Sequence, residues 1–169
     1  TRITFAVTDC SLGKLLVAAT DRGVCAVAFG DSTRELTAGL SGEFPAAQIE
    51  PDEDSLRNYV RAIVEHLDGT SRALELPLDL QATAFQLRVW AALRRIPYGE
   101  TRSYKQVAEE TGNVKAVRAV ARACAANPVA LVTPCHRVIS ANGDVNGYRW
   151  GAQRKRKLLD KERSTQNGG

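Results

Sequence analysis

The feature that most constrains the fold of this 169-residue chain is a change of character near residue 80. Residues 1–80 contain 7 Lys and Arg against 13 Asp and Glu, whereas residues 81–169 contain 16 against 6. The two parts therefore carry net charges of −6 and +10. The first part is rich in strand-forming runs, and the second has mostly helical patterns. We therefore expect an α/β chain in two parts, 1–80 and 81–169, with a polyanion, most often nucleic acid, as the partner of the second.

The first part has the pattern of a small sheet followed by helices. Ser32 and Glu35 have the spacing of a capping box, which predicts a helix that ends near Gly42. Apolar residues at helical spacing predict a second helix over 54–67. Residues 76–80 contain a proline and are expected to form a linker or an edge strand. Three strands joined by tight turns are predicted at 1–8, 14–20 and 24–29.

The second part contains the signals that begin and end short helices. Thr83 with Gln86 and Ser103 with Gln106 each have the spacing of a capping box. Another helix is predicted from about residue 152 to residue 163, and residues 164–169 are expected to be disordered. These boundaries predict a helical second part.

Two of the predicted helices form a helix-turn-helix candidate. The helix that Ser103 opens stops at a glycine, and Asn113 is expected to cap the next helix, over 114–126. Six alanines in that helix leave few side chains for reading base edges, so it suits close approach to DNA with little sequence specificity. An ordinary surface helix of a bundle is the alternative. The basic face of the helix predicted over 114–126 consists of Lys115, Arg118 and Arg122, and its apolar side consists of Val114, Val117, Ala121 and Cys124.

The four cysteines favour reduced thiols, because they share no tight spacing and the chain is long enough to fold without disulfides. No C-x-x-C pair occurs and the two histidines are far apart, so we expect no metal site. No segment has the length and apolarity of a membrane span, and the first residues lack a charged leader, so we expect a cytoplasmic protein, or a nuclear one in a eukaryote. The absence of methionine suggests an excised fragment of a longer protein.

Cys135 stands directly before His136, one of only two histidines in the chain. A thiol is a useful nucleophile only as the thiolate, and histidine is one of the few side chains that can take its proton near neutral pH. Apolar and β-branched neighbours over 133–139 predict that the pair lies on or beside a strand. Taken alone, however, the dipeptide is better explained by chance than by catalysis.

The surrounding segments resemble those of the O6-alkylguanine-DNA alkyltransferase family. The motif Pro-Cys-His-Arg-Val at 134–138 is preceded by Pro-Tyr-Gly-Glu-Thr at 97–101 and Ala-Val-Arg-Ala-Val at 116–120. Gly-Tyr-Arg-Trp-Gly at 147–151 is similar in particular to the C-terminal alkyltransferase domain of bacterial Ada proteins. The resemblance is dense over 76–162 and looser before it. It implies a ribonuclease H-like sheet-plus-helix part followed by a winged-helix-like DNA-binding part.

The resemblance implies direct repair of alkylated DNA. The protein would bind duplex DNA, rotate the damaged base out of the stack and transfer its alkyl group irreversibly to Cys135. The substrates implied are O6-alkylguanine, mainly O6-methylguanine, and also O4-methylthymine. Because the thiolate is the acceptor, the protein would need no cofactor, and it would act once. We expect it to act as a monomer.

The resemblance also implies roles for individual residues. Cys135 corresponds to the nucleophile, and His136 to its base, which works through a water molecule. Glu162 corresponds to the carboxylate that orients this histidine. Asn127 corresponds to the residue that supports the loop before the cysteine. Tyr104 corresponds to the tyrosine that donates toward the flipped base and contacts the DNA.

Other residues would contact the DNA or the damaged base. Arg118 corresponds to the arginine that fills the gap left by the flipped base, and a phosphate contact is its simpler role. Arg149 and Trp150 stand where some relatives have small residues. The bulky indole of Trp150 should narrow the base pocket, so we expect methyl adducts to react well and benzyl adducts slowly. The DNA-binding residues are then Arg118, Lys115, Arg122 and Tyr104. The residues expected to line the base pocket are Tyr148, Arg149, Trp150 and Val138.

Two other functions remain open. A non-enzymatic regulator would use the helix-turn-helix alone to bind DNA. A Cys-His hydrolase would use Cys135 and His136 on another substrate. Alkyltransferase-like proteins replace the cysteine, so the presence of Cys135 favours an active protein.

Overall fold

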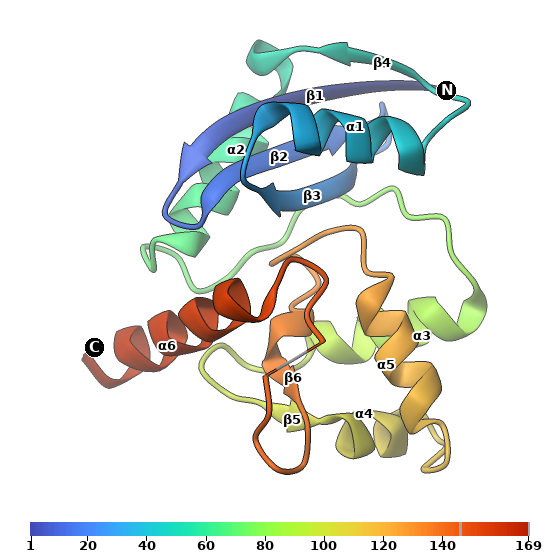
Figure 1. Cartoon of the computed structure of the whole chain (residues 1–169), viewed down its shortest axis with the longest axis vertical. Coiled ribbons are helices and arrows are strands. Elements are labelled where there is room, and N and C mark those ends of the chain that lie inside the picture. The colour runs from blue at the N-terminus through green and yellow to red at the C-terminus, as the bar shows by residue number, and fades with distance from the viewer. Residues whose placement is uncertain (146, 169) are drawn as a thin grey trace. The chain divides into compact units, whose positions relative to one another are not determined.

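The computed structural model describes residues 1–145 and 147–168 and divides into two compact units, which are treated separately here (Figure 1). The first unit consists of Thr1–Leu80 and Pro128–Val132, and the second of Gln81–Asn127 and the chain from Thr133 onward. The sequence placed 128–132 in the second part. This short segment instead belongs to the first unit, because its backbone pairs with the sheet there: Val27 N–H donates to Pro128 O, and Ala130 N–H donates to Val27 O, both at 2.9 Å.

The first unit is built on a four-stranded mixed sheet with the order β3-β2-β1-β4. The three predicted strands joined by tight turns are confirmed, and they pair antiparallel, with Thr8 opposite Leu15 and Leu16 opposite Ala28. The fourth strand pairs parallel to β1 and was not predicted, because its four residues include a single aliphatic side chain, Ile49. The strands are β1 (Arg2–Cys10), β2 (Gly13–Ala19), β3 (Val24–Gly30) and β4 (Gln48–Pro51).

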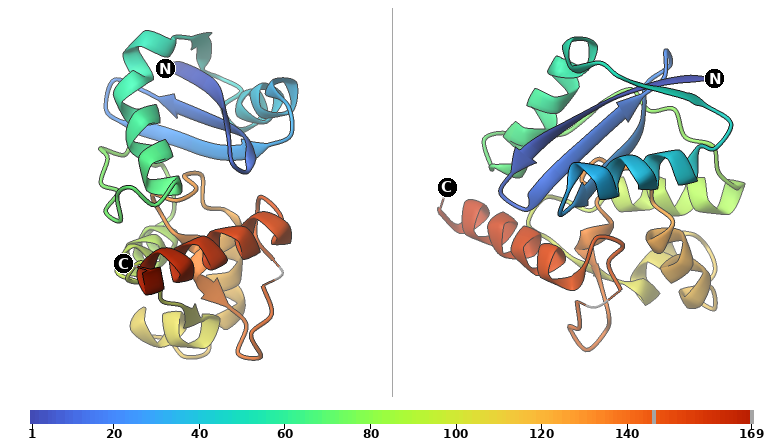
Figure 2. Two further views of the ribbon diagram at one scale, coloured as in Figure 1. Left: turned by 90° about the vertical axis from the view of Figure 1, so that its left-hand side faces the viewer. Right: turned by 45° about the horizontal axis from the view of Figure 1, so that its top comes forward.

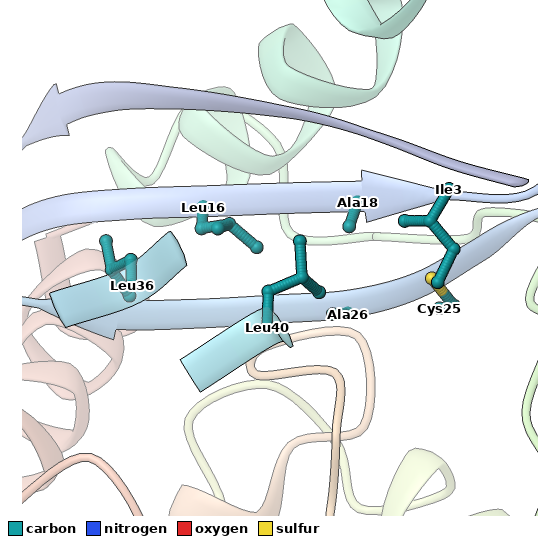
Figure 3. Packing of buried hydrophobic residues seen from close by; sticks show 7 residues of the cluster. All are labelled: Ile3, Leu16, Ala18, Cys25, Ala26, Leu36 and Leu40. Atoms are coloured by element: carbon teal, nitrogen blue, oxygen red, sulfur yellow. The ribbon is translucent and has the colours of Figure 1, made fainter. Parts of the chain in front are cut away.

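Helices α1 (Thr33–Glu43) and α2 (Glu53–Leu67) cover opposite faces of this sheet, as both the front and side views show (Figure 1, Figure 2). Leu36 and Leu40 of α1 pack onto one face, and Leu56 of α2 packs onto the other. Because both faces are covered, β2 and β3 are nearly continuous apolar runs instead of alternating ones. The cluster under α1 consists of Ile3, Leu16, Ala18, Cys25, Ala26, Leu36 and Leu40 (Figure 3).

Local hydrogen bonds explain where the helices of the first unit begin. Ser32 accepts from Glu35 N–H, but the Glu35 carboxylate accepts from Asp31 N–H, so only half of the predicted capping box forms. The Asp52 carboxylate accepts from Ser55 N–H, so α2 begins slightly before the predicted 54. The segment 76–80 pairs with β3 around Leu78, which supports the edge-strand alternative over a free linker.

The second unit is largely helical and contains one short parallel strand pair. Both predicted capping boxes, at Thr83 with Gln86 and at Ser103 with Gln106, are confirmed. The first three helices pack against one another, and the Trp90 indole N–H donates to Ala123 O at 2.8 Å. The elements are α3 (Ala84–Arg94), β5 (Arg102–Ser103), α4 (Tyr104–Glu110), α5 (Val117–Ala125), the 3₁₀ turn η1 (Cys135–Arg137), β6 (Val138–Ile139) and α6 (Ala152–Gly168).

Helix α5 differs from the prediction at its N-terminus. It begins at Val117, and the Asn113 side chain accepts from Lys115 N–H, so this asparagine closes a turn and does not cap the helix. Val114 precedes the helix and is 55% exposed, although it was predicted on the apolar side. The buried residues are Val120, Ala123 and Cys124, so of the four residues predicted on the apolar side only Cys124 is buried.

Helix α6 is longer than predicted. It continues to Gly168, so the expected disorder over 164–168 is wrong, and residue 169 lies outside the described residues. Over the described ranges, no helix combines the length and apolarity needed to cross a membrane.

Candidate active site

Cys135 begins the 3₁₀ turn η1, immediately before strand β6. This strand pairs in parallel with β5, with Val138 opposite Arg102, so the expected position beside a strand is confirmed. The turn is closed by hydrogen bonds from Cys135 N–H to Thr133 O at 2.8 Å and from Arg137 N–H to Pro134 O at 3.0 Å. The cysteine side chain is buried and its backbone is fixed.

Asn127, just after α5, holds the loop that leads to the cysteine. Its side chain is fully buried, and its amide nitrogen donates to Thr133 O at 2.8 Å and to the Cys135 sulfur at 3.3 Å. The structure therefore places this asparagine in direct contact with the thiol. An N–H donor favours the thiolate over the thiol, because the charged sulfur is the stronger acceptor.

Burial dominates the ionisation of Cys135 and raises its pKa to about 11. The hydrogen bond from Asn127 and the positive charges of Lys155 and Arg149 act against this rise. The thiol is therefore protonated at neutral pH, and a nucleophilic role requires a group that removes its proton.

His136 and Glu162 form a buried pair beside the cysteine. His136 Nε2 lies 2.6 Å from Glu162 Oε2, and the histidine ring is fully buried. Burial lowers the pKa of His136, although the carboxylate works in the opposite direction, so the ring is neutral. Because an ionised carboxylate only accepts, Nε2 carries the proton and Nδ1 has a free lone pair. Nδ1 is buried and has no hydrogen-bond partner among the described residues, so it is available as a proton acceptor.

The Glu162 carboxylate is held by more than His136. Arg137 donates to it from Nε at 2.8 Å and from Nη2 at 3.1 Å, and Gly99 N–H donates at 3.1 Å. Burial opposes ionisation of Glu162, but the hydrogen bonds and charges of His136 and Arg137 outweigh it and hold its pKa at about 2. The carboxylate therefore remains ionised at any pH at which the protein works.

Arg137 is the residue of this cluster that sequence reasoning missed. Its third donor, Nη1, reaches Ile96 O at 2.9 Å, and its guanidinium lies 5.4 Å from the centre of the Tyr98 ring. The available signal was an arginine in an otherwise apolar stretch next to the histidine. A charge in such a place needs a buried partner, and Glu162 is that partner.

Tyr104 is the first residue of α4, and its side chain is half-buried. Burial raises its pKa to about 12, with Cys124 and Cys135 adding to the rise, so the phenol stays protonated and can donate. A Cβ at Gly147 would lie 3.7 Å from the Tyr104 hydroxyl. The backbone at Gly147 has φ of +90°, a conformation that glycine adopts readily because it has no side chain. The missing side chain also leaves room beside the Tyr104 phenol.

An aromatic cluster lies next to His136. The Tyr148 ring meets the His136 ring edge-on at 6.5 Å and the Trp150 ring at 5.3 Å. The Arg149 guanidinium lies 5.3 Å from the centre of the Trp150 ring and donates to Asn127 O at 2.8 Å. Three of the four predicted pocket residues are thus in contact with one another or with the active-site loop. The fourth, Val138, is fully buried in β6.

The basic residues predicted to bind DNA lie on the exposed side of the helix-turn-helix. Arg118 and Arg122 are exposed on α5, and Lys115 is exposed in the turn before it. None of the three forms an ion pair within the described part of the chain. They are therefore available to an anionic partner. Within that same part of the chain, no three His, Cys, Asp or Glu side chains are grouped so as to hold a metal ion.

The chain matches two known domain models over most of its length. Residues 3–80 match the ribonuclease-like domain of 6-O-methylguanine DNA methyltransferase, and residues 84–164 match its DNA-binding domain. The chain belongs to the 6-O-methylguanine DNA methyltransferase family. The expected family and the expected α/β fold are both confirmed.

Relatives of this chain include the bifunctional transcriptional activator and DNA repair enzyme Ada of Escherichia coli, which is 48% identical over 160 residues. That match covers 95% of this chain but 45% of Ada, so the chain spans less than half of the length of this relative. The methylated-DNA–protein-cysteine methyltransferase of Methanosarcina acetivorans is 37% identical, with 95% of this chain and 98% of the relative covered.

Solved structures of methyltransferases share this fold. The structure of Mycobacterium tuberculosis OGT in complex with DNA is 34% identical in sequence to this chain and has a TM-score of 0.82. The match covers 98% of this chain and 94% of that one. The agreement extends through the ribonuclease-like and DNA-binding parts alike.

Proposed function

We propose that this methyltransferase repairs O6-alkylguanine in duplex DNA by transferring the alkyl group irreversibly to Cys135. The observation that carries the proposal is the active-site arrangement itself. A buried thiol is fixed by Asn127 next to a neutral histidine, and an ionised Glu162 leaves His136 Nδ1 as the proton acceptor. Relatives with this fold are named for methyl transfer from DNA to a protein cysteine.

In the first step the Cys135 thiol loses its proton. A pKa of about 11 leaves roughly one thiol in 10⁴ ionised at neutral pH, so an unassisted reaction would be slow. His136 Nδ1 takes the proton through a bridging water, and Glu162 stabilises the imidazolium through Nε2. Asn127 donates to the sulfur and favours the thiolate that forms.

In the second step the thiolate attacks the alkyl carbon of the flipped guanine. The S–C bond forms, the C–O6 bond breaks, and the electron pair remains on the guanine. Tyr104 donates a proton to the guanine ring, a general-acid contribution of about 10²–10⁴-fold. The imidazolium then gives its proton back to Tyr104. The net result is that guanine gains one proton and the Cys135 thiol loses one. A thioether has no easy leaving group, so each molecule reacts once.

Access to the alkyl carbon requires the base to leave the stack. We propose that α4 and α5 bind the duplex, that Lys115 and Arg122 contact phosphates, and that Arg118 occupies the gap left by the base. The exposure of the three cations supports this assignment, and a relative that shares the fold has been solved with DNA. Because phosphate contacts carry no base information, sequence preference should be slight.

The damaged base is proposed to bind against Tyr148, Arg149, Trp150 and Val138. Trp150 is buried and contacts Tyr148, which favours methyl over bulky adducts. We extend the substrate range to O4-methylthymine, which presents the same methyl–oxygen bond on a smaller base. Competition between the two methylated duplexes for a limited amount of protein would measure that preference.

The decisive test follows a labelled methyl group. The protein is incubated with a duplex that contains one labelled O6-methylguanine, and mass spectrometry locates the label. We expect one methyl group per protein, on the peptide that contains Cys135. A Cys135→Ser variant should bind the duplex and accept no label. DNA binding without any adduct would overturn the proposal and favour a helix-turn-helix regulator.

A further inference from the structure

Arg94 connects the surface of the second unit to the loop that carries Cys135, and neither the proposed reaction nor the proposed DNA contacts use it. The residue is the last of helix α3 and is exposed. Its Nη1 donates to the hydroxyl of Thr133 at 2.8 Å, across 39 positions of the chain. Thr133 is completely buried and lies two residues before the reactive cysteine. An exposed arginine thus holds a buried polar group of the reactive loop.

The hydrogen bond between Arg94 and Thr133 has a charged donor. None of the ion pairs of the described residues includes Arg94, so no carboxylate competes for its guanidinium. A guanidinium N–H forms a stronger hydrogen bond than a neutral donor does. Among the residues that the structure describes, the Thr133 hydroxyl has no other hydrogen-bond partner. Loss of Arg94 would therefore leave a buried hydroxyl without its partner, which is unfavourable inside a protein.

The backbone carbonyl of Thr133 orients the groups around the thiol. Thr133 O accepts from Cys135 N–H and from the Asn127 amide nitrogen, both at 2.8 Å. The same amide nitrogen donates to Cys135 Sγ at 3.3 Å, so each of its two hydrogens has an acceptor. Because the two N–H bonds of a planar amide have a fixed angle between them, the position of Thr133 O determines where the second N–H points.

We propose that Arg94 is a positioning residue for methyl transfer, which acts through Thr133 and Asn127 on the Cys135 sulfur. With Thr133 held at both its hydroxyl and its carbonyl, the Asn127 amide has one orientation and keeps its second N–H on the sulfur. Without Arg94, the loop is free to shift, and the hydrogen bond that favours the thiolate lengthens. The role in transfer rests on the proposed function, whereas the effect on the thiol does not.

Two simpler roles would also account for an exposed arginine at the end of α3. A cation at the C-terminal end of a helix interacts favourably with the helix dipole, which would affect stability alone. A surface cation could instead contact a DNA phosphate, which would affect binding alone. Both roles apply equally to Arg95, which is exposed at the end of the same helix and has no side-chain partner among the described residues. Arg95→Met is therefore the matched control.

The first test compares Arg94→Met, which has neither charge nor donor, with Arg94→Lys, which has both. Thiolate formation at Cys135 is followed by ultraviolet absorbance against pH without DNA, with Cys135→Ser in the same background subtracted. Single-turnover methyl transfer is measured at saturating duplex. We expect Arg94→Met to have an about fivefold smaller thiolate fraction and to react more slowly by a similar factor, with unchanged duplex affinity. Arg94→Lys should recover most of this loss, and Arg95→Met should match the wild type.

The second test asks whether Arg94 acts through Thr133. Thr133→Val keeps the shape of the side chain and removes its hydroxyl, whereas Thr133→Ser keeps the hydroxyl. We expect Thr133→Val to lower the thiolate fraction and the transfer rate as Arg94→Met does, and Thr133→Ser to stay near the wild type. Because both changes remove the same hydrogen bond, the double variant Arg94→Met with Thr133→Val should be no slower than either single variant.

Additive losses in the double variant would overturn the proposal. An Arg94→Met protein that loses stability or duplex affinity while its thiolate titration stays unchanged would overturn it as well. Thermal unfolding checks that each variant is folded, and if one pair of variants unfolds, the other pair still decides. Failure of the proposed function looks different: the wild type forms no methyl adduct, while its thiolate titration still responds to Arg94→Met.

Discussion

His136 Nε2 lies 2.6 Å from Glu162 Oε2, and this contact leaves the other ring nitrogen as the proton acceptor. Replacing Glu162 by Gln keeps the shape of the side chain. The amide, however, offers His136 and Arg137 one neutral acceptor oxygen in place of the two oxygens of the ionised carboxylate. We expect single-turnover methyl transfer to fall by about 10²-fold or more, because the imidazolium loses its carboxylate. Breaking the buried pair should also lower the free energy of unfolding by about 3–5 kcal/mol. Asp160→Asn, on the exposed side of the same helix, is the matched control and should change neither quantity.

The same pair predicts acid lability. The pKa of Glu162 is about 2, below its ordinary 4.5, so its ionisation stabilises the fold above pH 4.5 and that stability is lost as the pH falls through about 2. This shift in the pKa of Glu162 corresponds to on the order of 3 kcal/mol in the free energy of unfolding. Burial also depresses the pKa of His136, so the unfolded chain binds that proton first and stability falls below about pH 6.5.

Urea unfolding of the wild type and Glu162→Gln at a series of pH values measures this effect. The wild type should lose stability more steeply than the variant between pH 5 and pH 2, because only the wild type has this carboxylate to protonate. Parallel curves for the two proteins would show that Glu162 is not held in its ionised form.

Trp150 should control adduct size. Its buried ring packs against Tyr148 at 5.3 Å and beneath the Arg149 guanidinium. In Trp150→Ala, we expect the rate with O6-benzylguanine DNA to rise about tenfold or more relative to the rate with O6-methylguanine DNA. The variant should be about 3–5 kcal/mol less stable, so rates are measured where thermal unfolding shows it folded. Equal methyl and benzyl rates in the wild type would remove the basis for the prediction.

The exposed cations of the helix-turn-helix should separate into two roles. Lys115→Ala should weaken binding to all duplexes alike and reduce the slope of log affinity against log salt by about one. Arg118→Ala should lower that slope and also slow transfer from a paired base more than from an unpaired one, because it no longer fills the gap. Arg22→Ala, an exposed change in the first unit, is the control and should alter neither slope nor rate. Fluorescence anisotropy across a salt series measures the binding.

Local patterns in the sequence predicted most elements of the fold, including both capping boxes of the second unit. The strand at Ile49 was missed, because an edge strand of four residues has too few apolar positions to show a period. The pairing of 128–132 with β3 was missed because a contact between distant segments leaves no local signal. Of the site, the sequence placed Cys135 beside His136, and the family resemblance implied Glu162 and Asn127, whose contacts with that pair are made by the fold.

Arg137 is the clearest such case, since its role depends on a carboxylate 25 residues away. Two of its nitrogens bind Glu162 and the third binds Ile96 O, a fork that a lysine ammonium cannot reproduce. Arg137→Lys keeps the charge and loses the fork, so Glu162 should turn further toward His136. We expect the pKa of His136 to rise and methyl transfer to slow by about tenfold or more, with the larger loss at lower pH. NMR titration of the two imidazoles measures the pKa of His136 directly, with His66 as the internal reference. An unchanged His136 titration in a folded Arg137→Lys protein would show that the fork does not control the histidine.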